Sequence, residues 1–475
     1  MMATFLDAID RADAAMPAVG DDTEAITYGD LRRQAVRAAA RAATYGRQQY
    51  LVLRATPTVR FVTTLLGVMH SGNVPIPVDP DLPENGLAFI MEKSGAAGII
   101  DPFALDEIEG FPSVDHRDDS IPALVLFTSG TTGRPKGVVI SHANLLHSCR
   151  AISEYLGYAH HRSAAVSLPL HYSYALLSQI CCQLATGGRV RIFGDLRNPI
   201  RFSRVVNEQQ LETFCGVPST FHALSIVHAI SPLCMPTIRV LCSAGAAMDR
   251  SKLATIKEIF PNSTFFNNYG MTEAAPRIAY IREDDPRFHE PTCGRPIEGV
   301  DVKVVDPDTF RDLPEGDTGV LVVRGPNVTS GYLNDPEQTE QAFTPDGYLI
   351  SGDIAYIRDG YIFICGRHDD IFNSGGEKIA PLEIERALNT IEGVEMSAVT
   401  GWADEQRGAV PIAFLKLTRC VSRREVIERL SAELTHARIP ARLLEVSAFP
   451  MTANGKLQRK RLSPDDPAYV IREIR

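Results

Sequence analysis

Short apolar runs alternate with longer helical patterns through much of this 475-residue chain. Examples are residues 123–127, 237–242 and 264–266, each followed by a segment rich in Ser, Thr, Asn or Gly. Such runs are typical of buried strands, and strands that alternate with helices indicate an α/β fold. In parallel α/β sheets, ligand-binding loops follow the carboxyl ends of the strands. We therefore expect the polar segments after these runs to contain the functional site.

The pattern changes in the last third of the chain. From about Val300 to Ile364 it consists of short strands and tight turns, such as residues 359–361, which predicts a β-rich subdomain. Helical periodicity returns at Leu382–Leu388 and at Arg423–His436.

We place the main domain boundary at residue 368 on the basis of this change. Residues 1–367 are expected to form a large N-terminal domain of parallel-rich α/β subdomains, with the β-rich subdomain at about residues 300–365. Residues 368–475 are expected to form a small α+β domain. The predicted class is therefore α/β.

Composition excludes several classes of protein. The net charge of −10 argues against a nucleic-acid-binding surface, which is normally basic. No apolar run approaches the roughly 18 residues of a membrane span, and the first residues lack the basic and apolar pattern of a secretory signal. The 9 cysteines are odd in number and lack Cys-x-x-Cys spacing, which argues against disulfides or a zinc site. We expect a cytoplasmic protein with no nucleic-acid or membrane partner.

The segment Leu126–Gly137 is rich in candidate chemistry, with glycines, hydroxyl side chains and two cations. Glycines allow the backbone to approach a ligand closely, and successive N–H groups, hydroxyls and cations can surround phosphate oxygens. Its spacing differs from a Walker A loop, because Gly130 and Gly133 are too close together and Pro135 precedes Lys136. We interpret the segment as a phosphate loop of another class. The alternative is a surface loop rich in turn-forming residues.

A second candidate motif covers residues 267–273, Asn-Asn-Tyr-Gly-Met-Thr-Glu. The ring of Tyr269, beside Gly270, offers a flat face for a purine, and Thr272 offers a hydroxyl to phosphate. Glu273 offers a hard oxygen of the kind that Mg²⁺ prefers. The alternative is a turn followed by a helix start with a favourable acid.

The segments at residues 126–137 and 267–273 resemble motifs of the adenylate-forming superfamily, and they follow one another along the chain in the same order as in that superfamily. That superfamily comprises acyl- and aryl-CoA ligases, adenylation domains of nonribosomal peptide synthetases, and luciferases. The resemblance covers nearly the whole chain and is strongest from Leu126 to Lys456. It implies a C-terminal domain that is mobile about a hinge at Asp369.

The resemblance implies ATP and Mg²⁺ as cofactors and assigns four catalytic residues. Lys456 would reach the α-phosphate and the substrate carboxylate, and Lys136 would steady the departing pyrophosphate beneath a mobile lid. Thr272 would contact phosphate, and Glu273 would be the metal ligand. The other expected nucleotide-binding residues are Thr128, Ser129, Gly130, Thr131, Thr132, Gly133, Gly245, Ala246, Asn267, Asn268, Tyr269, Gly270, Asp353 and Arg367.

Residues 168–175 resemble the motif that begins the acyl pocket. Amino-acid-activating members normally carry an aspartate there, and this chain has none. The resemblance therefore implies an apolar or aryl acid with a polar edge in preference to an α-amino acid. The expected substrate residues are His171, Tyr172, Ser173, Ser219, Ala244, Gly245 and Met271.

Residues 374–385 resemble the version of a C-terminal motif found in acyl- and aryl-CoA ligases. In those enzymes the C-terminal domain rotates and a glycine-rich strand then borders the pantetheine tunnel. Gly375 and Gly376 would take that place here. The alternative is a bulge before a helix.

The implied reaction is activation of a small carboxylic acid to an acyl-adenylate with release of pyrophosphate, followed by transfer to a pantetheine thiol, most simply that of CoA. Transfer to a pantetheinylated carrier protein, or to an amine as in an amide synthetase, remains an alternative because it would use the same motifs. A non-catalytic nucleotide-binding relative would have a broken motif, and an oxidative luciferase-like enzyme has no discriminating support. The chain is expected to be a monomer or a homodimer.

Overall fold

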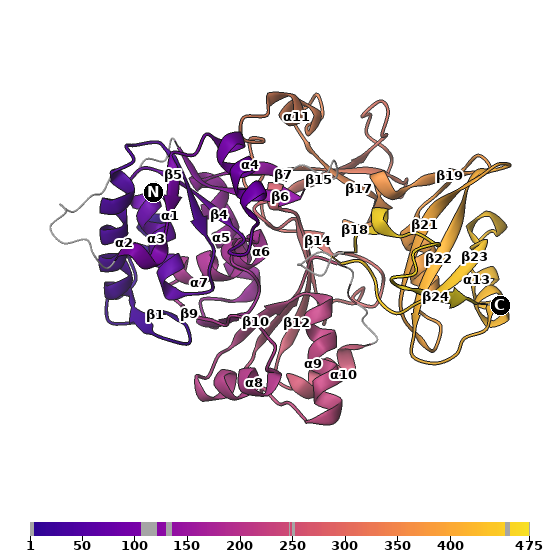
Figure 1. The fold of residues 1–475 in the computed structure, drawn as a ribbon, viewed down its shortest axis with the longest axis horizontal. Coiled ribbons are helices and arrows are strands. Elements are labelled where there is room, and N and C mark those ends of the chain that lie inside the picture. Colours follow the sequence, from indigo (N-terminus) through magenta and orange to yellow (C-terminus); the bar gives the residue numbers. More distant parts are fainter. Residues whose placement is uncertain are drawn as a thin grey trace. The chain divides into compact units, whose positions relative to one another are not determined.

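The computed structural model describes residues 4–105, 121–129, 135–246, 248, 252–451 and 457–474. The chain divides into two compact units (Figure 1). Unit 1 comprises Met1–Val302 and Val323–Ile350, and unit 2 comprises Lys303–Val322 and Ser351–Arg475.

The described part of unit 1 is built on a nine-stranded sheet (Figure 1). In spatial order its strands are β14 (Arg295–Pro296), β13 (Ala279–Arg282), β12 (Thr264–Tyr269), β11 (Val240–Ser243), β10 (Thr213–Gly216), β8 (Ser163–Val166), β9 (Arg189–Ile192), β1 (Pro17–Gly20) and β2 (Ala25–Thr27). From β12 to β1 neighbouring strands pair in parallel, whereas β14, β13 and β2 are antiparallel. Strands β8, β10 and β11 are buried along their whole length, as expected for parallel strands covered on both faces.

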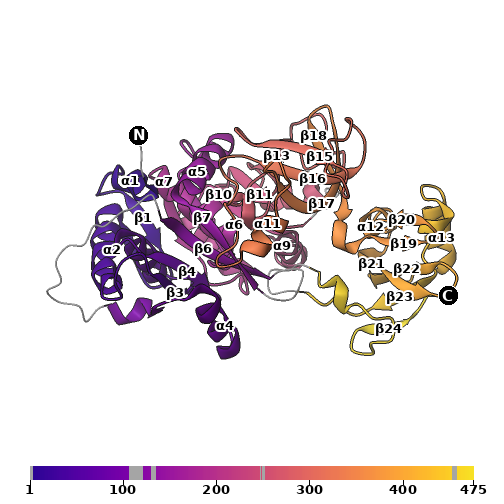
Figure 2. The same ribbon diagram turned by 90° about the horizontal axis from the view of Figure 1, so that it is seen from above.

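Two smaller sheets also lie in the described part of unit 1. One is parallel, with β4 (Val74–Val78), β3 (Tyr50–Arg54) and β5 (Gly98–Ile100) in that order. The other is an antiparallel pair of β6 (Pro122–Ser129) and β7 (Pro135–Ser141). Strand β6 contacts β4 (Figure 2).

The helices of unit 1 start at well-defined caps. The side chains of Thr27, Thr58 and Ser141 accept hydrogen bonds from the first turns of α2, α3 and α5. Gly67 lets α3 lie close to α2, because a Cβ there would come within 2.4 Å of the Ala38 side chain. A π-helical segment, Leu176–Cys181, joins α6 to α7. The bounds are α1 (Phe5–Asp10), α2 (Tyr28–Ala43), α3 (Val59–His70), α4 (Glu84–Ser94), α5 (His142–Leu156), α6 (Ser173–Ala175), α7 (Cys182–Ala185), α8 (Pro199–Glu208), α9 (Pro218–Ile230), α10 (Leu253–Ile259) and α11 (Pro336–Gln341).

Unit 2 contains most of one four-stranded sheet and two further sheets. The first has β15 (Asp301–Val305), β16 (Gly319–Arg324), β17 (Leu349–Arg358) and β18 (Tyr361–Arg367) in that order. The second pairs β19 (Phe372–Ser374) with β20 (Glu377–Ile379). The third has β21 (Val394–Asp404), β22 (Gly408–Leu417), β23 (Arg442–Val446) and β24 (Val470–Glu473). Helices α12 (Pro381–Leu388) and α13 (Arg423–Ser431) bury Ile384 and Leu430 in a common core with this third sheet.

The predicted fold class is confirmed, and the differences from the sequence-based expectations are local. Residues 237–242 and 264–266 lead into parallel strands as expected, whereas the run at 123–127 forms one strand of an antiparallel hairpin. The helix expected at Arg423–His436 ends at Ser431, and a separate 3-10 turn begins at His436. The boundary at residue 368 remains a prediction. No helix within the described ranges is long and apolar enough to cross a membrane.

Candidate functional site

Parallel strands of unit 1 bring several expected site segments to one edge of the large sheet. Gly216 pairs with Ser243, and Ser243 pairs with Asn267, so β10, β11 and β12 end side by side. Strand β8 is the parallel neighbour of β10. The carboxyl ends of parallel strands share one edge of a sheet, which is the usual place for ligand loops. The segments that leave this edge are residues 167–174, 217–221, 244–246 and 270–273.

A hydroxyl contact links the expected nucleotide motif to the expected acyl motif. The Oγ1 atom of Thr272 lies 2.9 Å from the Oγ atom of Ser173, and either hydroxyl can donate. Thr272 begins a 3-10 turn just after β12, and Ser173 begins α6. The two residues are 99 positions apart in the sequence, so only the tertiary fold brings them together.

Glu273, Tyr332 and Lys136 form a second cluster. The hydroxyl of Tyr332 donates to Oε1 of Glu273 at 3.0 Å, and Nζ of Lys136 lies over the Tyr332 ring, 5.0 Å from its centroid. Burial, with the negative charge of Glu273, raises the pKa of Tyr332, so its hydroxyl remains a donor. No local pattern indicated a role for Tyr332, because a tyrosine beside a glycine carries no signal of a contact with a residue 59 positions away.

The glycine-rich loop connects the two strands of the β6–β7 hairpin. Thr128 and Lys136 pair across the hairpin, next to the pair formed by Ser129 and Pro135. The intervening expected residues lie outside the described residues, namely Gly130, Thr131, Thr132 and Gly133. The hairpin therefore holds the two ends of the phosphate loop at a fixed spacing.

Strand β12 carries two buried asparagines, Asn267 and Asn268, just before its last residue, Tyr269. Oδ1 of Asn268 accepts a hydrogen bond from the Tyr155 hydroxyl at 2.9 Å, and Tyr155 stacks on Tyr280 with ring centroids 3.8 Å apart. Asn268 therefore has a partner inside the protein, and its nucleotide contact remains a prediction, as do those of Asn267 and Tyr269. At Gly270 a Cβ would lie 2.0 Å from the carbonyl oxygen of Pro276, so the backbone here has no room for a side chain.

The expected acyl-pocket residues differ in exposure. His171 places Nε2 3.9 Å from Oδ2 of Asp79 and packs edge-on against Tyr172. Burial lowers the pKa of His171, and the Asp79 carboxylate opposes this shift, so the ring favours its neutral form. Ala244 is buried, Met271 is partly buried, and Ser219, Gly245 and Ala246 are exposed.

Unit 2 brings together the two residues expected at the ribose. Asp353 and Arg367 face each other across β17 and β18, with Nη1 of Arg367 3.0 Å from Oδ1 of Asp353. The same Nη1 also donates to the Ser351 carbonyl oxygen at 3.2 Å. Asp353 is 8% exposed, so a buried carboxylate is held in place by an arginine.

The loop that carries Lys456 lies outside the described residues, but its two ends are fixed. Met451 and Leu457 form a β-bridge, and Gln458 N donates to the Pro450 carbonyl oxygen at 2.8 Å. Nε of Arg459 then lies 3.1 Å from Oδ2 of Asp370, within the same unit.

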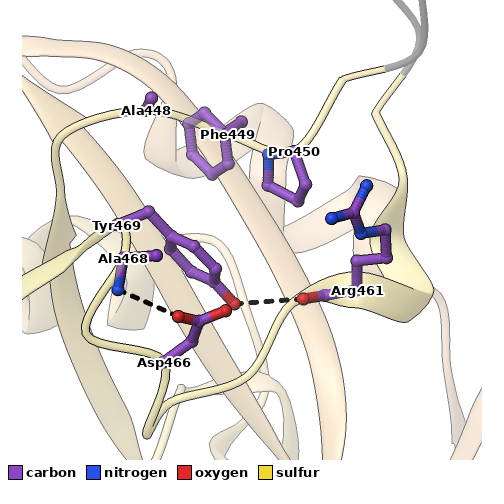
Figure 3. Close-up of a pocket in the computed structure, with 7 residues that line it drawn as sticks. All are labelled: Ala448, Phe449, Pro450, Arg461, Asp466, Ala468 and Tyr469. Carbon is purple, nitrogen blue, oxygen red and sulfur yellow. Dashed lines mark hydrogen bonds between the residues drawn. The ribbon is translucent and has the colours of Figure 1, made fainter.

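A pocket of about 230 Å³ lies beside these ends (Figure 3). In Figure 3 the Tyr469 hydroxyl donates to the Arg461 carbonyl oxygen at 3.1 Å, and Ala468 N donates to the Asp466 carboxylate at 2.9 Å. Its lining contains none of the expected site residues, so we do not assign it to the nucleotide.

Gly375 and Gly376 connect β19 to β20 in a tight hairpin. Both have positive φ, +59° and +93°, which explains why glycine is needed at each position. Gly375 also lines a pocket of about 400 Å³ together with Ser374, Glu377, Arg407, Thr435, His436 and Ala437. The expected hinge residue, Asp369, lies in a 3-10 turn, His368–Asp370. Their roles in a thiol tunnel and a hinge remain predictions.

The donor set around Glu273 is compatible with Mg²⁺. Protein sites for Mg²⁺ commonly supply one or two carboxylates, and phosphate oxygens and water complete the octahedron. Nowhere in the described chain is a group of three or more His, Cys, Asp or Glu side chains arranged to hold a metal ion.

Two family models match most of the chain. The family model for the AMP-binding enzyme matches residues 7–333, and that for the AMP-binding enzyme C-terminal domain matches residues 383–456. The chain is 30% identical over 370 residues to 4-coumarate–CoA ligase 1 of Petroselinum crispum, covering 75% of this chain and 67% of that protein. It is 29% identical over 368 residues to 2-succinylbenzoate–CoA ligase of Enterococcus faecalis, covering 76% and 74%.

A solved structure shows the same fold. O-succinylbenzoate Coenzyme A synthetase from Bacillus subtilis, in complex with ATP and magnesium ion, superposes with a TM-score of 0.86. The two chains are 23% identical, and the superposition covers 97% of this chain and 99% of the other.

Proposed function

Because the chain belongs to the family of AMP-binding enzymes, which form adenylates, we propose that it activates a carboxylic acid with ATP and passes the acyl group to the thiol of CoA. Its relatives named as 4-coumarate– and 2-succinylbenzoate–CoA ligases support this reaction. The observation that carries the proposal is the contact between Thr272 and Ser173, which joins a phosphate-binding motif to an acyl-binding motif.

The first half-reaction requires a better leaving group than the oxide of a carboxylate. The carboxylate attacks the α-phosphorus of ATP, the bond to pyrophosphate breaks, and the product is an acyl-adenylate whose AMP leaves readily. Negative charge gathers on the phosphate oxygens, so hydroxyl donors and cations placed there lower the barrier. We assign the Thr272 hydroxyl and Lys456 to the α-phosphate and Lys136 to the departing pyrophosphate.

Glu273 would hold Mg²⁺ together with the ATP phosphates, and the ion would supply neutralising charge. The Tyr332 hydroxyl holds one carboxylate oxygen of Glu273 in place through their hydrogen bond. The other oxygen is then the natural ligand for the ion. The relative solved with ATP and magnesium ion supports this cofactor pair.

Asp353 would accept hydrogen bonds from both ribose hydroxyls, which a carboxylate can do with its two oxygens. Arg367 orients that carboxylate through the ion pair between them.

The second half-reaction would use a rotation of residues 368–475 about Asp369, after which Gly375 and Gly376 border the path of the thiol. Glycines leave room for a thin pantetheine arm. The thiol attacks the acyl carbon, the bond to the AMP oxygen breaks, and a thioester and AMP are released. CoA is the acceptor most consistent with the named relatives, and we also propose a cytoplasmic monomer or homodimer.

The experiment that tests the proposal is ATP–pyrophosphate exchange by the purified chain with a panel of aryl, alkyl and α-amino acids. We expect exchange with aryl or alkyl acids and thioester formation when CoA is added. A clear preference for α-amino acids would contradict the assignment of the acyl pocket. Acyl transfer only to a pantetheinylated carrier protein, or only to an amine, would contradict CoA as the acceptor.

A further inference from the structure

Arg277 is the bulkiest of the fully buried side chains in the described chain, with 2% of its surface exposed. It follows Glu273 by one short turn, and its backbone is fixed. Its amide N donates to the Ala274 carbonyl oxygen at 3.1 Å, and its carbonyl oxygen accepts from Nδ2 of Asn327 at 2.7 Å. The position of this cation is therefore set by the main chain of the site.

The guanidinium has no carboxylate partner anywhere among the residues that the structure describes. Nη2 donates to Oγ of Ser178 at 3.4 Å, and the carbon of the guanidinium lies 5.4 Å from the centroid of the Tyr174 ring. Nε is buried and has no hydrogen-bond partner. A buried cation without a counter-charge is strongly unfavourable.

The ionisable groups that face Arg277 are two tyrosines and two cysteines, Tyr155, Tyr174, Cys215 and Cys242. Burial raises the pKa of both tyrosines and of Cys242, which leaves these groups uncharged at neutral pH. A hydrogen bond with Cys242 lowers the pKa of Cys215, burial opposes this shift, and the Arg277 charge lowers it further. Cys215 is therefore the internal group that could compete as a counter-charge.

The location of the guanidinium points to the acyl pocket. Tyr174 directly follows Ser173, whose hydroxyl contacts Thr272. Cys215 and Cys242 directly precede the two strand ends, Gly216 and Ser243, at the loop-bearing edge of the sheet. Ser178 lies on the π-helical segment, and such segments occur frequently at functional sites. The Tyr174 side chain is only partly buried, although its hydroxyl oxygen is buried and has no hydrogen-bond partner among the described residues.

We propose that Arg277 binds a second carboxylate of the acid substrate, so that the enzyme prefers acids with an anionic group remote from the carboxylate that reacts. The inference rests on the proposed function and names its substrate class. A planar guanidinium can hold a carboxylate through two parallel hydrogen bonds. One of these bonds would give Nε of Arg277 the partner that it lacks among the described residues. An acid with an entirely apolar side chain would leave the positive charge of Arg277 without a counter-charge from the substrate.

Matched pairs of acids test this proposal in the full-length chain. Exchange kinetics are measured with hexanoate against adipate and with cinnamate against 4-carboxycinnamate. We expect the wild type to favour the diacid of a pair by at least about tenfold in kcat/KM. Arg277→Leu should lower kcat/KM for that diacid by about 10- to 100-fold, the range for a hydrogen bond to a charged group, and should leave the monoacid nearly unchanged. Arg277→Lys, which keeps the charge without the fork, should retain part of the preference.

Arg282→Leu is the matched control. Arg282 is an exposed arginine at the end of β13, and its Nε lies 3.1 Å from Oδ1 of Asp284. It should change neither kinetic constant. Thermal unfolding gives a readout that does not depend on catalysis. The diacid should raise the Tm of the wild type and not of Arg277→Leu, whereas the free Arg277→Leu protein should be at least as stable as the wild type.

Equal use of diacid and monoacid by the wild type, or an unchanged diacid preference in Arg277→Leu, overturns the inference. A result that identifies Cys215 as the counter-charge also overturns the inference. In that case Cys215→Ser destabilises the free protein, and no diacid raises the Tm of the wild type. Absence of exchange with every acid refutes the proposed function instead. In that case the diacid-dependent Tm shift still decides whether Arg277 forms an anion site.

Discussion

Tyr332 illustrates how one neutral side chain can organise two charged ones. Its hydroxyl holds Glu273 at 3.0 Å, and its ring lies under Lys136. Tyr332 is therefore a positioning residue, since it acts through Glu273 and Lys136.

Tyr332→Phe removes the hydroxyl and keeps the ring. We expect the rate of pyrophosphate exchange to fall about tenfold or more, and the Mg²⁺ concentration for half-maximal rate to rise, because Glu273 loses its orientation. Tyr356→Phe is the control, since Tyr356 stacks on Phe363 in unit 2. An unchanged Mg²⁺ dependence would contradict the positioning role.

His171 predicts a pH dependence of stability. Burial lowers its pKa below the ordinary value of 6.5, so the folded state binds a proton less readily than the unfolded state. The stabilisation is present above pH 6.5 and is lost as the pH falls through the lower, folded-state pKa. His171→Asn should therefore reduce the loss in free energy of unfolding between pH 7 and pH 5, measured by urea denaturation. His160→Asn, at an exposed position, controls for the replacement of a histidine by asparagine and should leave the free energy of unfolding at pH 7 as in the wild type.

At the scale of elements, the turn after β12 determines where the nucleotide motif lies. The backbone of residues 275–277 packs against Gly270 so closely that a Cβ would lie 2.0 Å from a carbonyl oxygen. This contact fixes the path of the chain on both sides of Thr272 and Glu273. Packing by itself therefore requires a glycine at this position.

Gly270→Ala should lower the free energy of unfolding by about 1–3 kcal/mol, because a backbone atom must move to accommodate the methyl group. Chemical denaturation measures the loss directly. Gly86→Ala is a suitable comparison, since Gly86 lies in α4 and its new Cβ would meet only the Leu82 side chain, at 3.0 Å. That variant should be neutral or slightly more stable. Equal stability of the two variants would show that the turn can relax.

At the scale of the whole molecule, the proposed reaction divides the two half-reactions between different parts of the C-terminal domain. Lys456→Ala should lower acyl-adenylate formation by about 10²- to 10³-fold, the usual effect of losing one preorganised donor. A preformed acyl-adenylate should still be consumed by CoA at nearly the wild-type rate. Rapid-quench measurements of the two steps separate these effects.

Lys416→Ala is the control for this prediction, because Lys416 pairs with Glu395 on the sheet of the C-terminal domain. It should leave both half-reactions unchanged. Adenylation by Lys456→Ala at the wild-type rate would contradict the assignment of Lys456, and loss of thiol transfer as well would indicate a defect of the whole domain.

The local motifs and the order of elements could be read from the sequence. Runs of β-type residues and intervening helical periodicity predicted an α/β fold, because burial of apolar side chains follows directly from their spacing. Resemblance of the motifs placed Thr272, Glu273, Asp353 and Arg367 in a nucleotide site. The structure brings the last two within 3.0 Å of each other.

Contacts between distant segments were decided only by the tertiary structure. No local pattern in the sequence shows that Ser173 meets Thr272 or that Tyr332 meets Glu273. Nor does one show that the Arg277 guanidinium lies over the Tyr174 ring. These contacts depend on strand order, on register and on the packing of loops at one sheet edge, which are properties of the whole chain. The sequence by itself therefore determined the family and the reaction class. The tertiary structure decided which side chains surround Thr272 and Glu273 and which groups lie beside the buried guanidinium of Arg277.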